Sequence, residues 1–489
     1  MDADDMKAGD MEAGDISGPA AEAKQPFELL LAVSRELPGT LSTQIETQMR
    51  SAIREGLLHR GSRLPSTREL AGQLGVSRRI TVDAYAQLAA EGYLQLRQGS
   101  PPRVAGTTTP AAPGLAPAPP SPSSPPVRYD FRPSRPDVSL FPRTTWIRCL
   151  RAAVTNISND DLSYGDAIGV HQLRKELAEY LGRVRGVVAE PDRVVITNGY
   201  LQGLGLLCQA LAASGARRIA LEDPSSFEEP LIAERAGLQP VRVPVDEFGI
   251  SVDHLDRVDA DAVVLTPAHQ HPTGVVLAPQ RRAALVGWLR ARDAIAIEDD
   301  YDAEYRYDRA AVGSLQGLAP DRVVYSGTAS KVLAPALRLG WFVVPAGLID
   351  AVRTEKLLAD QGTARIEQLA FALFLQRGDL DRHLRRMRAR YRARRNQMIE
   401  ALAAELPEGV VRGIAAGLHV TVELPPNDDE AAIRREATAR HIALSTLRDY
   451  RPASTGLPPT LILGYSQMSD NRIRAGIREL AAAVRAARR

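Results

Sequence analysis

A proline-rich segment constrains the fold of this 489-residue chain more than any other feature. Residues 105–127 read AGTTTPAAPGLAPAPPSPSSPPV and hold eight prolines, which lack a backbone N–H donor and favour extended polyproline II. Such a segment acts as a semi-rigid tether between two folded bodies rather than as part of a helix or sheet. We therefore predict at least two domains, in agreement with a usual domain length of about 100–200 residues.

Composition narrows the class of protein further. Hydrophobic residues make up 44% and charged residues 25%, as in globular proteins. The sequence contains no run of 18 apolar residues, so we predict no membrane-spanning helix. Cys149 and Cys208 alone provide neither a disulfide framework nor a zinc motif, so we expect a cytoplasmic protein without a metal site. Residues 1–25 hold seven acidic and two basic residues without apolar periodicity, which predicts a disordered acidic tail.

The segment before the proline-rich tether, residues 26–104, predicts three helices and a hairpin. Apolar residues at helical spacing mark a first helix over 41–57. A Ser-Thr-Arg-Glu capping box opens the second, over 66–75, and the third spans 77–92. Two short alternating segments around Gly99 predict the hairpin. The expected inner stripe of the third helix is Val82, Tyr85, Ala86, Leu88 and Ala89.

This order of elements is typical of a winged helix-turn-helix, an α+β DNA-binding fold. Its third helix would enter the major groove by its N-terminus, where an arginine can bond to guanine O6 and N7. The net charge of 26–104 is +3, from ten arginines and seven acidic residues. A packing module with surface arginines is the alternative interpretation. The expected DNA contacts are Ser66, Arg68, Ser77, Arg78, Arg79 and the wing-tip residue Gly99.

Residues 61–92 also resemble the GntR-type DNA-binding domain. The matching motifs are RLPSTRELA from Arg63, LGVSR from Leu74, and the residues Tyr85, Leu88, Glu91 and Gly92. The resemblance adds Thr67 and Thr81 to the expected DNA contacts, and it implies double-stranded operator DNA as the partner.

The remaining residues, 128–489, predict a second and larger domain. β-Branched apolar runs alternate with helical stretches, which favours an α/β fold with a mainly parallel sheet. The functional residues of such sheets lie after the carboxyl ends of the strands. The predicted strands are Arg193–Thr197, Arg218–Leu221, Gln239–Val245, Ala262–Thr266, Ala294–Ile297, Arg322–Ser326 and Trp341–Val344.

Two polar motifs follow predicted strands of this domain. The motif SGTASK ends at Lys331, whose amine can attack an aldehyde if a sheltered pocket disfavours its charged form. The motif IEDDYD, residues 297–302, places carboxylates and a phenol after another strand, where a carboxylate can keep a pyridine nitrogen protonated. Taken singly, the first motif is typical of a surface loop and the second of an acidic turn; together they indicate one site.

Residues 128–489 resemble a fold-type-I aminotransferase that binds pyridoxal 5′-phosphate (PLP). The motifs SYGD from Ser163, TPAHQHPTG from Thr266 and GLH from Gly417 match further landmarks of that family. With the GntR-type head, the whole chain resembles the MocR/GabR regulators. The resemblance implies that Lys331 forms the internal aldimine, that Asp299 pairs with the pyridine nitrogen and that Tyr301 pairs with the 3′-oxygen. It implies cofactor contacts from Thr328, Ser330, Arg338, Gly199 and His271, and it leaves Arg448 as a candidate for an effector carboxylate, with a structural ion pair as the alternative.

These features predict a PLP-dependent, ligand-responsive transcriptional regulator. An amino compound, or PLP itself, would be sensed by the aminotransferase-like domain of a homodimer, as the resemblance implies. The first alternative is an active aminotransferase with an accessory DNA-binding head. The second is a constitutive DNA-binding protein with an inactive sensor domain, because bulky Tyr200 and Leu201 and the small Ser226 depart from the aminotransferase pattern.

Overall fold

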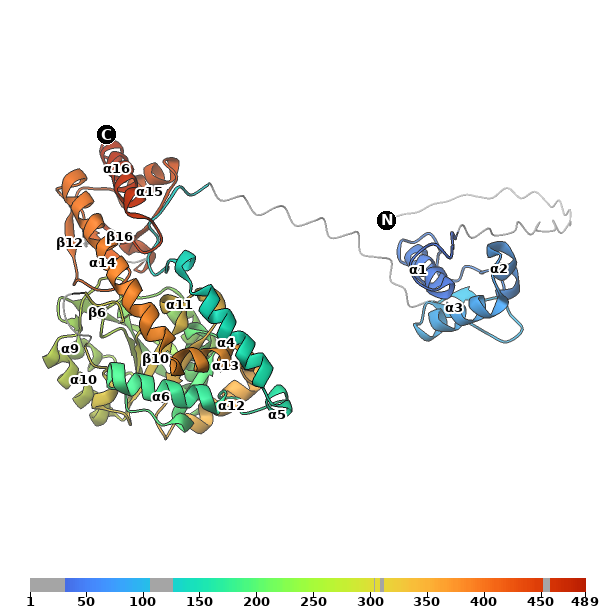
Figure 1. The fold of residues 1–489 in the computed structure, drawn as a ribbon, viewed down its shortest axis with the longest axis horizontal. Helices are drawn as coiled ribbons and strands as arrows, with labels where there is room; N and C mark the ends of the chain where they lie inside the picture. The colour runs from blue at the N-terminus through green and yellow to red at the C-terminus, as the bar shows by residue number, and fades with distance from the viewer. Residues whose placement is uncertain (1–30, 106–125, 303, 308–311, 452–457) are drawn as a thin grey trace, which may run out of the picture. The chain divides into compact units, whose positions relative to one another are not determined.

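The computed structural model describes residues 31–105, 126–302, 304–307, 312–451 and 458–489. These residues belong to two compact units, one within 1–123 and the other within 124–489 (Figure 1). The predicted acidic tail and nearly all of the predicted tether lie outside the described residues, so both stay predictions.

The first unit is a winged helix-turn-helix, as predicted. Helices α1 and α2 both pack against α3, and β1 pairs with β2 in an antiparallel hairpin. Ile45, Met49, Leu70, Tyr85 and Leu88 are fully buried and form the centre of its core. The elements are α1 (Leu41–Arg54), α2 (Thr67–Leu74), α3 (Arg78–Ala90), β1 (Leu94–Gln95) and β2 (Arg103–Val104).

The predicted capping box fixes the start of α2. The Ser66 hydroxyl accepts a hydrogen bond from the Glu69 amide (3.2 Å), and the Glu69 carboxylate accepts one from the Ser66 amide (2.8 Å). Gly75 ends the helix in the left-handed conformation at φ +63°, where a side chain would be strained. Local hydrogen bonds therefore set both ends of this helix.

Two details of the predicted helices are wrong. Leu57 was expected on the inner face of the first helix, but α1 ends at Arg54 and Leu57 is 72% exposed; Leu58 fills the core instead. In α3, Val82 and Ala86 face solvent, whereas Thr81 and Ala84 are buried. The buried face of α3 is therefore rotated relative to the predicted one. Thr81, although polar, lies on this face together with Tyr85 and Leu88.

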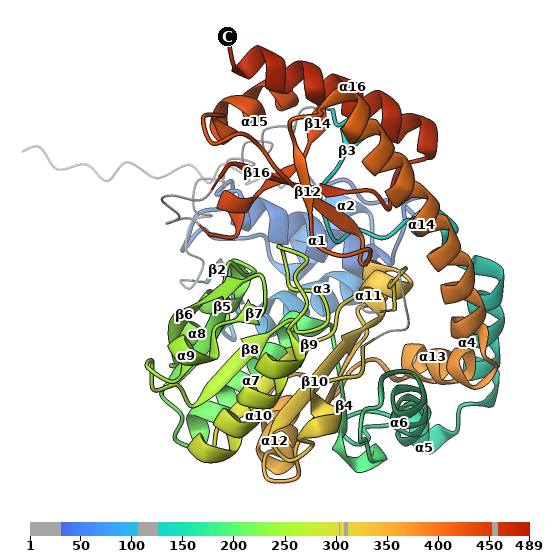
Figure 2. The same ribbon diagram turned by 90° about the vertical axis from the view of Figure 1, so that its left-hand side faces the viewer.

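The second unit is built on an eight-stranded sheet of order β4-β11-β10-β9-β8-β5-β6-β7 (Figure 2). Strands β6, β5, β8, β9 and β10 pair in parallel, and β11 and β7 pair antiparallel with their neighbours. The prediction of a mainly parallel sheet is thus confirmed. The strands are β4 (Val194–Thr197), β5 (Arg218–Asp223), β6 (Gln239–Asp246), β7 (Gly249–Ile250), β8 (Ala262–Leu265), β9 (Ile295–Asp299), β10 (Val323–Thr328) and β11 (Gly340–Val343).

Both faces of this sheet are covered. Ile297 and Val324 belong to an apolar cluster with α7, α8 and α12, whereas the preceding residues Ala296 and Val323 belong to another with α9 and α10. Because successive side chains of a strand point to opposite faces, the helices lie on both sides. The helices with residues in these two clusters are α7 (Tyr200–Ala213), α8 (Glu228–Arg235), α9 (Val252–Leu255), α10 (Pro279–Arg292) and α12 (Ile349–Asp360).

A smaller sheet of order β12-β13-β16-β15 and a short β14-β3 pair complete the unit. Helix α14 packs against α16, and α16 against α15 (Figure 2). No helix of the described ranges is both long and apolar enough to cross a membrane. The remaining strands are β3 (Tyr129–Asp130), β12 (Val410–Arg412), β13 (His419–Glu423), β14 (Ile442–Ala443), β15 (Ser445–Thr446) and β16 (Thr460–Gly464). The remaining helices are α4 (Arg143–Asn156), α5 (Asn159–Leu162), α6 (His171–Arg185), α11 (Ala329–Val332), α13 (Arg365–Gln376), α14 (Asp379–Glu405), α15 (Glu430–Ala439) and α16 (Asp470–Ala487).

A buried ion pair ties the end of α6 to the end of β9. Arg185 Nε lies 2.7 Å from the Asp300 carboxylate, both side chains are almost fully buried, and the Tyr325 hydroxyl donates to the same carboxylate (2.7 Å). Removing one partner leaves the other charge buried and unpaired.

We expect Arg185→Met to lower the free energy of unfolding of this unit by about 3–5 kcal/mol. The exposed pair of Arg412 and Glu423 provides the control, because Arg412→Met leaves no buried charge and should scarcely shift the transition. Urea unfolding followed by tryptophan fluorescence reports on this unit alone, since all three tryptophans lie in it. Equal shifts for the two variants would contradict the expectation.

Candidate functional site

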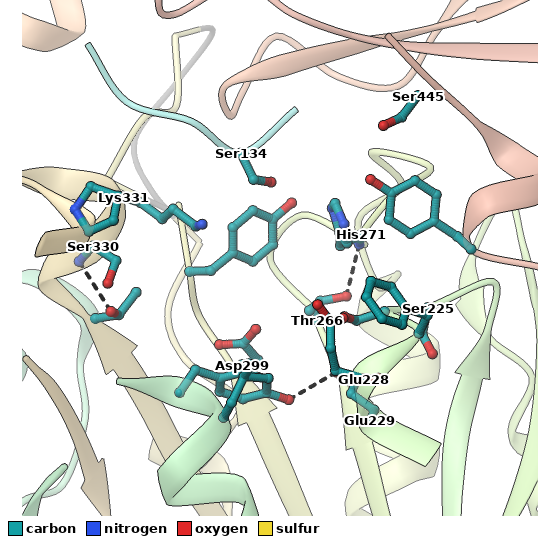
Figure 3. A pocket seen from close by; sticks show the side chains of 18 of the residues that line it. Ser134, Ser225, Glu228, Glu229, Thr266, His271, Asp299, Ser330, Lys331 and Ser445 are labelled. Carbon is teal, nitrogen blue, oxygen red and sulfur yellow. Dashed lines mark hydrogen bonds between the residues drawn. The ribbon is translucent and has the colours of Figure 1, made fainter. Parts of the chain in front are cut away.

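A cavity of about 660 Å³ opens at the carboxyl ends of the central strands. Figure 3 shows Lys331 and Ser330 on one side, Thr266 and His271 on the other, and Asp299 between them. Each of these residues follows or ends a parallel strand, as the sequence predicted for the site. The smaller sheet and the segment before α4 complete the wall. The lining residues are Ser134, Tyr200, Leu201, Ser225, Ser226, Phe227, Glu228, Glu229, Thr266, His271, Asp299, Tyr301, Thr328, Ser330, Lys331, Pro335, Arg338, Ser445, Asp449 and Tyr450.

Lys331 lies on the short helix α11, directly after β10. Burial lowers the pKa of its amine below the ordinary value, although the negative charges of Asp299 and Asp302 act in the opposite direction. A lower pKa raises the fraction of free amine, which is the form that attacks an aldehyde. Lys331 is therefore sheltered, as the sequence predicts, and its reaction with an aldehyde stays a prediction.

Asp299 ends β9 and lies beneath Lys331 in Figure 3. Burial raises the pKa of this carboxyl well above its ordinary value, and the nearby Glu229 and Asp300 raise it further. Glu229 is itself buried, with a pKa raised by burial to about 7, and accepts a hydrogen bond from the Tyr200 hydroxyl (2.9 Å). A protonated ring nitrogen would suit this group of buried acids, because its N–H would place a positive charge next to the Asp299 carboxyl.

Tyr301 is held from behind by a histidine and a carboxylate. Its hydroxyl lies 3.1 Å from His269 Nδ1, which in turn lies 3.1 Å from Asp302. His271 packs edge-on against Tyr301 and Tyr450, and its buried Nδ1 has no hydrogen-bond partner among the described residues. His269 and Asp302 belong to the motifs TPAHQHPTG and IEDDYD, but no role for either residue was predicted from the sequence.

A third group of residues lies at the start of α7, and we call it the anion-binding corner after the kind of ligand that its chemistry would favour. Gly199 precedes the helix at φ +92°, and a Cβ atom there would lie 2.7 Å from Arg338 Nη2. Only glycine therefore lets the arginine approach this turn. The first amides of a helix lack intrahelical acceptors and favour anions, so Arg338 and the α7 N-terminus fit a phosphate. Thr328 and Ser330 line the same cavity.

Arg448 does not line the cavity, so the expectation that it binds an effector there is not supported. Its side chain is 66% exposed, and its Nε lies 3.5 Å from Glu430, which fits the alternative of a structural ion pair. The adjacent Asp449 and Tyr450 line the cavity instead. A short 3-10 turn over Leu447–Asp449 sends neighbouring side chains in different directions.

The predicted DNA contacts lie at two helix starts and at the hairpin. Ser77, Arg78 and Arg79 are exposed at the start of α3, and Arg68 is exposed in the first turn of α2. Ser66 and Thr67 lie beside Arg68 and are partly buried. Gly99 is exposed between β1 and β2.

Thr81 is the exception, and its predicted DNA contact is wrong. It is fully buried, and its hydroxyl donates to the carbonyl oxygens of Thr67 (2.7 Å) and Arg78 (2.9 Å). Thr81 therefore joins the first turns of α2 and α3 rather than contacting a base.

A buried carboxyl that was not predicted from the sequence orders the His271 loop. Glu222, in β5, accepts hydrogen bonds from the Thr266 amide (3.0 Å), the Thr266 hydroxyl (2.7 Å) and the Gln270 side chain (3.2 Å). Burial raises its pKa to about 7. A carboxylate inside an apolar strand is the signal that could have found it. No metal-binding group of His, Cys, Asp and Glu occurs in the part of the chain that the structure describes.

The two units define the class of the protein as a DNA-binding head joined to an aminotransferase fold. Residues 41–104 match the family "Bacterial regulatory proteins, gntR family", and residues 140–461 match "Aminotransferase class I and II". The second unit is similar to the kynurenine aminotransferase of Pyrococcus horikoshii, with a TM-score of 0.67 and 25% identity over 74% of this chain and 92% of that one.

Full-length relatives place the chain in one family. It is 33% identical to the HTH-type pyridoxine biosynthesis transcriptional regulator PdxR of Corynebacterium glutamicum, covering 94% of this chain and 99% of that protein. It is 30% identical to the probable rhizopine catabolism regulatory protein MocR of Rhizobium meliloti, covering 93% and 96%. The chain belongs to the MocR-type family of HTH-type transcriptional regulators, in which a GntR head is joined to an aminotransferase-like domain.

The buried Glu222 generates a pH-dependent prediction. The folded protein keeps this proton up to about pH 7, whereas an unfolded glutamate loses it near 4.5. Between these values the folded state binds more protons, so the free energy of unfolding falls as pH rises. Glutamine stays neutral, and Glu222→Gln should therefore flatten this fall by at most about 1.4 kcal/mol per pH unit.

Urea unfolding at several values between about pH 5 and pH 7 measures this slope. The exposed Glu234→Gln on α8 is the matched control and should keep the wild-type slope. A Glu222→Gln curve parallel to that of wild type would contradict the assignment.

Proposed function

We propose that this protein is a PLP-dependent transcriptional regulator that changes its DNA binding when the aminotransferase-like unit binds an amino compound or PLP itself. The observation that carries the proposal is one chain in which a basic recognition helix accompanies a cavity with Lys331 above a buried Asp299. We place the protein in the cytoplasm, where it meets DNA.

The first unit, which we call the head, supports DNA as the partner. Arg78 and Arg79 stand at the exposed N-terminus of α3, where they would read base edges in the major groove. Arg68 and the start of α2 would bind the phosphate backbone, and the hydrogen bonds of Thr81 keep the two helix starts together. The wing around Gly99 would contact the flanking backbone.

The chemistry of the residues in and beside the cavity supports PLP as the cofactor. PLP supplies an electrophilic aldehyde, a protonated ring nitrogen and a phosphate. Lys331 would hold the aldehyde through its amine, Asp299 would bind the ring N–H, and Tyr301 would donate to the ring oxygen. Arg338, Gly199, Thr328 and Ser330 would hold the phosphate, while His271 lines the opposite wall with an unpartnered nitrogen. The name of the relative PdxR, a pyridoxine biosynthesis regulator, supports a vitamin B6 compound as ligand.

An active aminotransferase is the second candidate. The same lysine, aspartate and arginine are present, and a solved aminotransferase covers 74% of this chain. The full-length relatives are named as regulators, which favours the first candidate. A regulator needs a ligand that binds its two states with different affinity, whereas an enzyme needs turnover.

We also propose that the protein forms a homodimer through its second unit. Tyr164 is 88% exposed, and Ile147, Val154, Leu162 and Leu358 also expose apolar side chains on α4, α5 and α12 or beside them. Arg353 binds Asp166 (2.5 Å) and Arg365 binds Asp161 (2.7 Å), so ion pairs hold the segment that carries Tyr164. Apolar surface of this kind is typical of protein interfaces.

The head proposal predicts that Arg78→Ala weakens binding to DNA selected by the wild-type protein from random duplexes. We expect a loss of about 1–3 kcal/mol together with relaxed preference at one base position. Fluorescence anisotropy with labelled duplexes measures both. Arg50→Ala is the control, because it removes the same charge at the other end of α3, where Arg50 pairs with Glu91. Equal losses for the two variants would indicate a purely electrostatic effect and contradict base reading.

The cofactor proposal predicts that PLP added to wild type gives an absorbance band shifted from that of the free aldehyde, and that Lys331→Ala does not give this shift. The lysine is the amine that would hold the aldehyde, and alanine cannot replace it. The same two proteins should differ in DNA affinity on addition of PLP or an amine, with a response in wild type alone. The same shifted band in Lys331→Ala would contradict the assignment of Lys331, and rapid turnover of an amino acid with an oxo-acid would favour the enzyme.

A further inference from the structure

We propose that Asp360, which does not line the cavity, is a positioning residue for the phosphate of the cofactor. It would act by holding the Asn198–Gly199 turn and, through that turn, Arg338. The inference rests on the proposed binding of PLP. Asp360 is the last residue of α12, a helix that packs against α7 beneath the anion-binding corner.

A fully buried lysine stands at the centre of this arrangement. Lys356 has 0% exposure, and its amine donates to both carboxylate oxygens of Asp360 (2.8 and 2.6 Å) and to Thr363 (3.0 Å). The Gln202 side-chain oxygen lies 3.3 Å from the same amine. Three donors of one ammonium group thus meet three different side chains, which fixes the position of Asp360 relative to α7.

Asp360 passes this fixed position to the start of α7. Its Oδ2 accepts hydrogen bonds from Asn198 Nδ2 (3.0 Å) and Gln202 Nε2 (2.7 Å), and its Oδ1 accepts one from the Gly362 amide (2.9 Å). Burial acts to raise the pKa of Asp360, but the hydrogen bonds from Lys356 and Gln202 outweigh it and lower the pKa. The group is therefore a carboxylate at neutral pH, able to accept from all its donors at once.

Asn198 connects this carboxylate to the phosphate corner. Its main-chain amide donates to Gln202 Oε1 (2.7 Å), and its main-chain carbonyl oxygen accepts a hydrogen bond from Arg338. Side chain and main chain of one residue are thus held at three points. The next residue is Gly199, whose open conformation leaves room for the guanidinium of Arg338. A shift of Asn198 would move both the helix amides and the arginine that face the phosphate.

A neutral amide cannot replace Asp360. The carboxylate accepts five hydrogen bonds from four groups, and an amide offers one acceptor oxygen and two N–H donors that would face other donors. Asp360→Asn should therefore release Asn198 while leaving every residue of the cavity wall unchanged. Asn198→Ala removes only the link to Asp360 and leaves the Lys356–Asp360 pair intact, so it is the milder variant if Asp360→Asn folds poorly.

Binding of PLP compared with pyridoxal, which lacks the phosphate, tests the inference by absorbance titration of the full-length protein. We expect Asp360→Asn and Asn198→Ala to weaken PLP binding about tenfold or more and pyridoxal binding less than about twofold. The double variant should lose no more than Asp360→Asn alone, because both act through one contact. Asp428→Asn is the control: its carboxylate pairs with Arg488, neither residue lines the cavity, and both affinities should stay at wild-type values.

Three results would overturn the inference. Equal weakening of PLP and pyridoxal would mean that Asp360 only stabilises the fold, and unchanged affinity for both would mean that it has no role in binding. Strictly additive losses in the double variant would show that Asp360 does not act through Asn198. Failure of wild type to bind either compound would instead contradict the proposed function itself, so the two failures are distinguishable.

Discussion

The parallel register of β9 with its neighbours is the constraint on which the site depends. Asp299 lies opposite Ser326 of β10, and Glu298 lies opposite Leu265 of β8. Because the three strands end within a few residues of one another in this register, the loops after them meet in one place, and α11 carries Lys331 to the space above Asp299. A shift of one residue in this pairing would turn Asp299 to the other face of the sheet. The chemistry of the cavity is therefore a consequence of hydrogen bonds between main chains.

Burial of charge is the consequence of that geometry. Asp299, Glu229 and Glu222 all have pKa values raised by burial, whereas the pKa of Lys331 is lowered. Nearby cations offset part of this charge: Arg242 acts on Glu229, and Lys331 acts on Asp299. The second unit thus holds acids that favour a cationic partner next to a corner that favours an anion. PLP, the cofactor that we propose, carries both kinds of group.

Local sequence signals predicted much of this structure. Neighbours in sequence set the capping box at Ser66, the glycine at position 75 and seven of the eight strands of the large sheet. The ends of the predicted strands located Lys331 and Asp299. The features that the sequence did not predict have a different physical origin. Thr81 and Arg448 are polar residues whose direction depends on tertiary packing, and Asp360 acts across 162 positions of sequence on Asn198. Contacts of that kind leave no periodic pattern in one sequence, so only the folded chain reveals them.

The shared walls of the cavity explain how an enzyme fold can serve regulation. Lys331, Asp299 and Arg338 come from the large sheet and its loops, whereas Asp449, Tyr450 and Ser445 come from the smaller sheet region. A ligand that contacts both stabilises the arrangement in which they are close, by RT ln(1 + [L]/Kd) for a ligand that binds that arrangement alone. This free energy is available whether or not the ligand reacts. Regulation therefore requires that the arrangement of the two regions be coupled to the DNA-binding state of the head. It does not require turnover of the ligand.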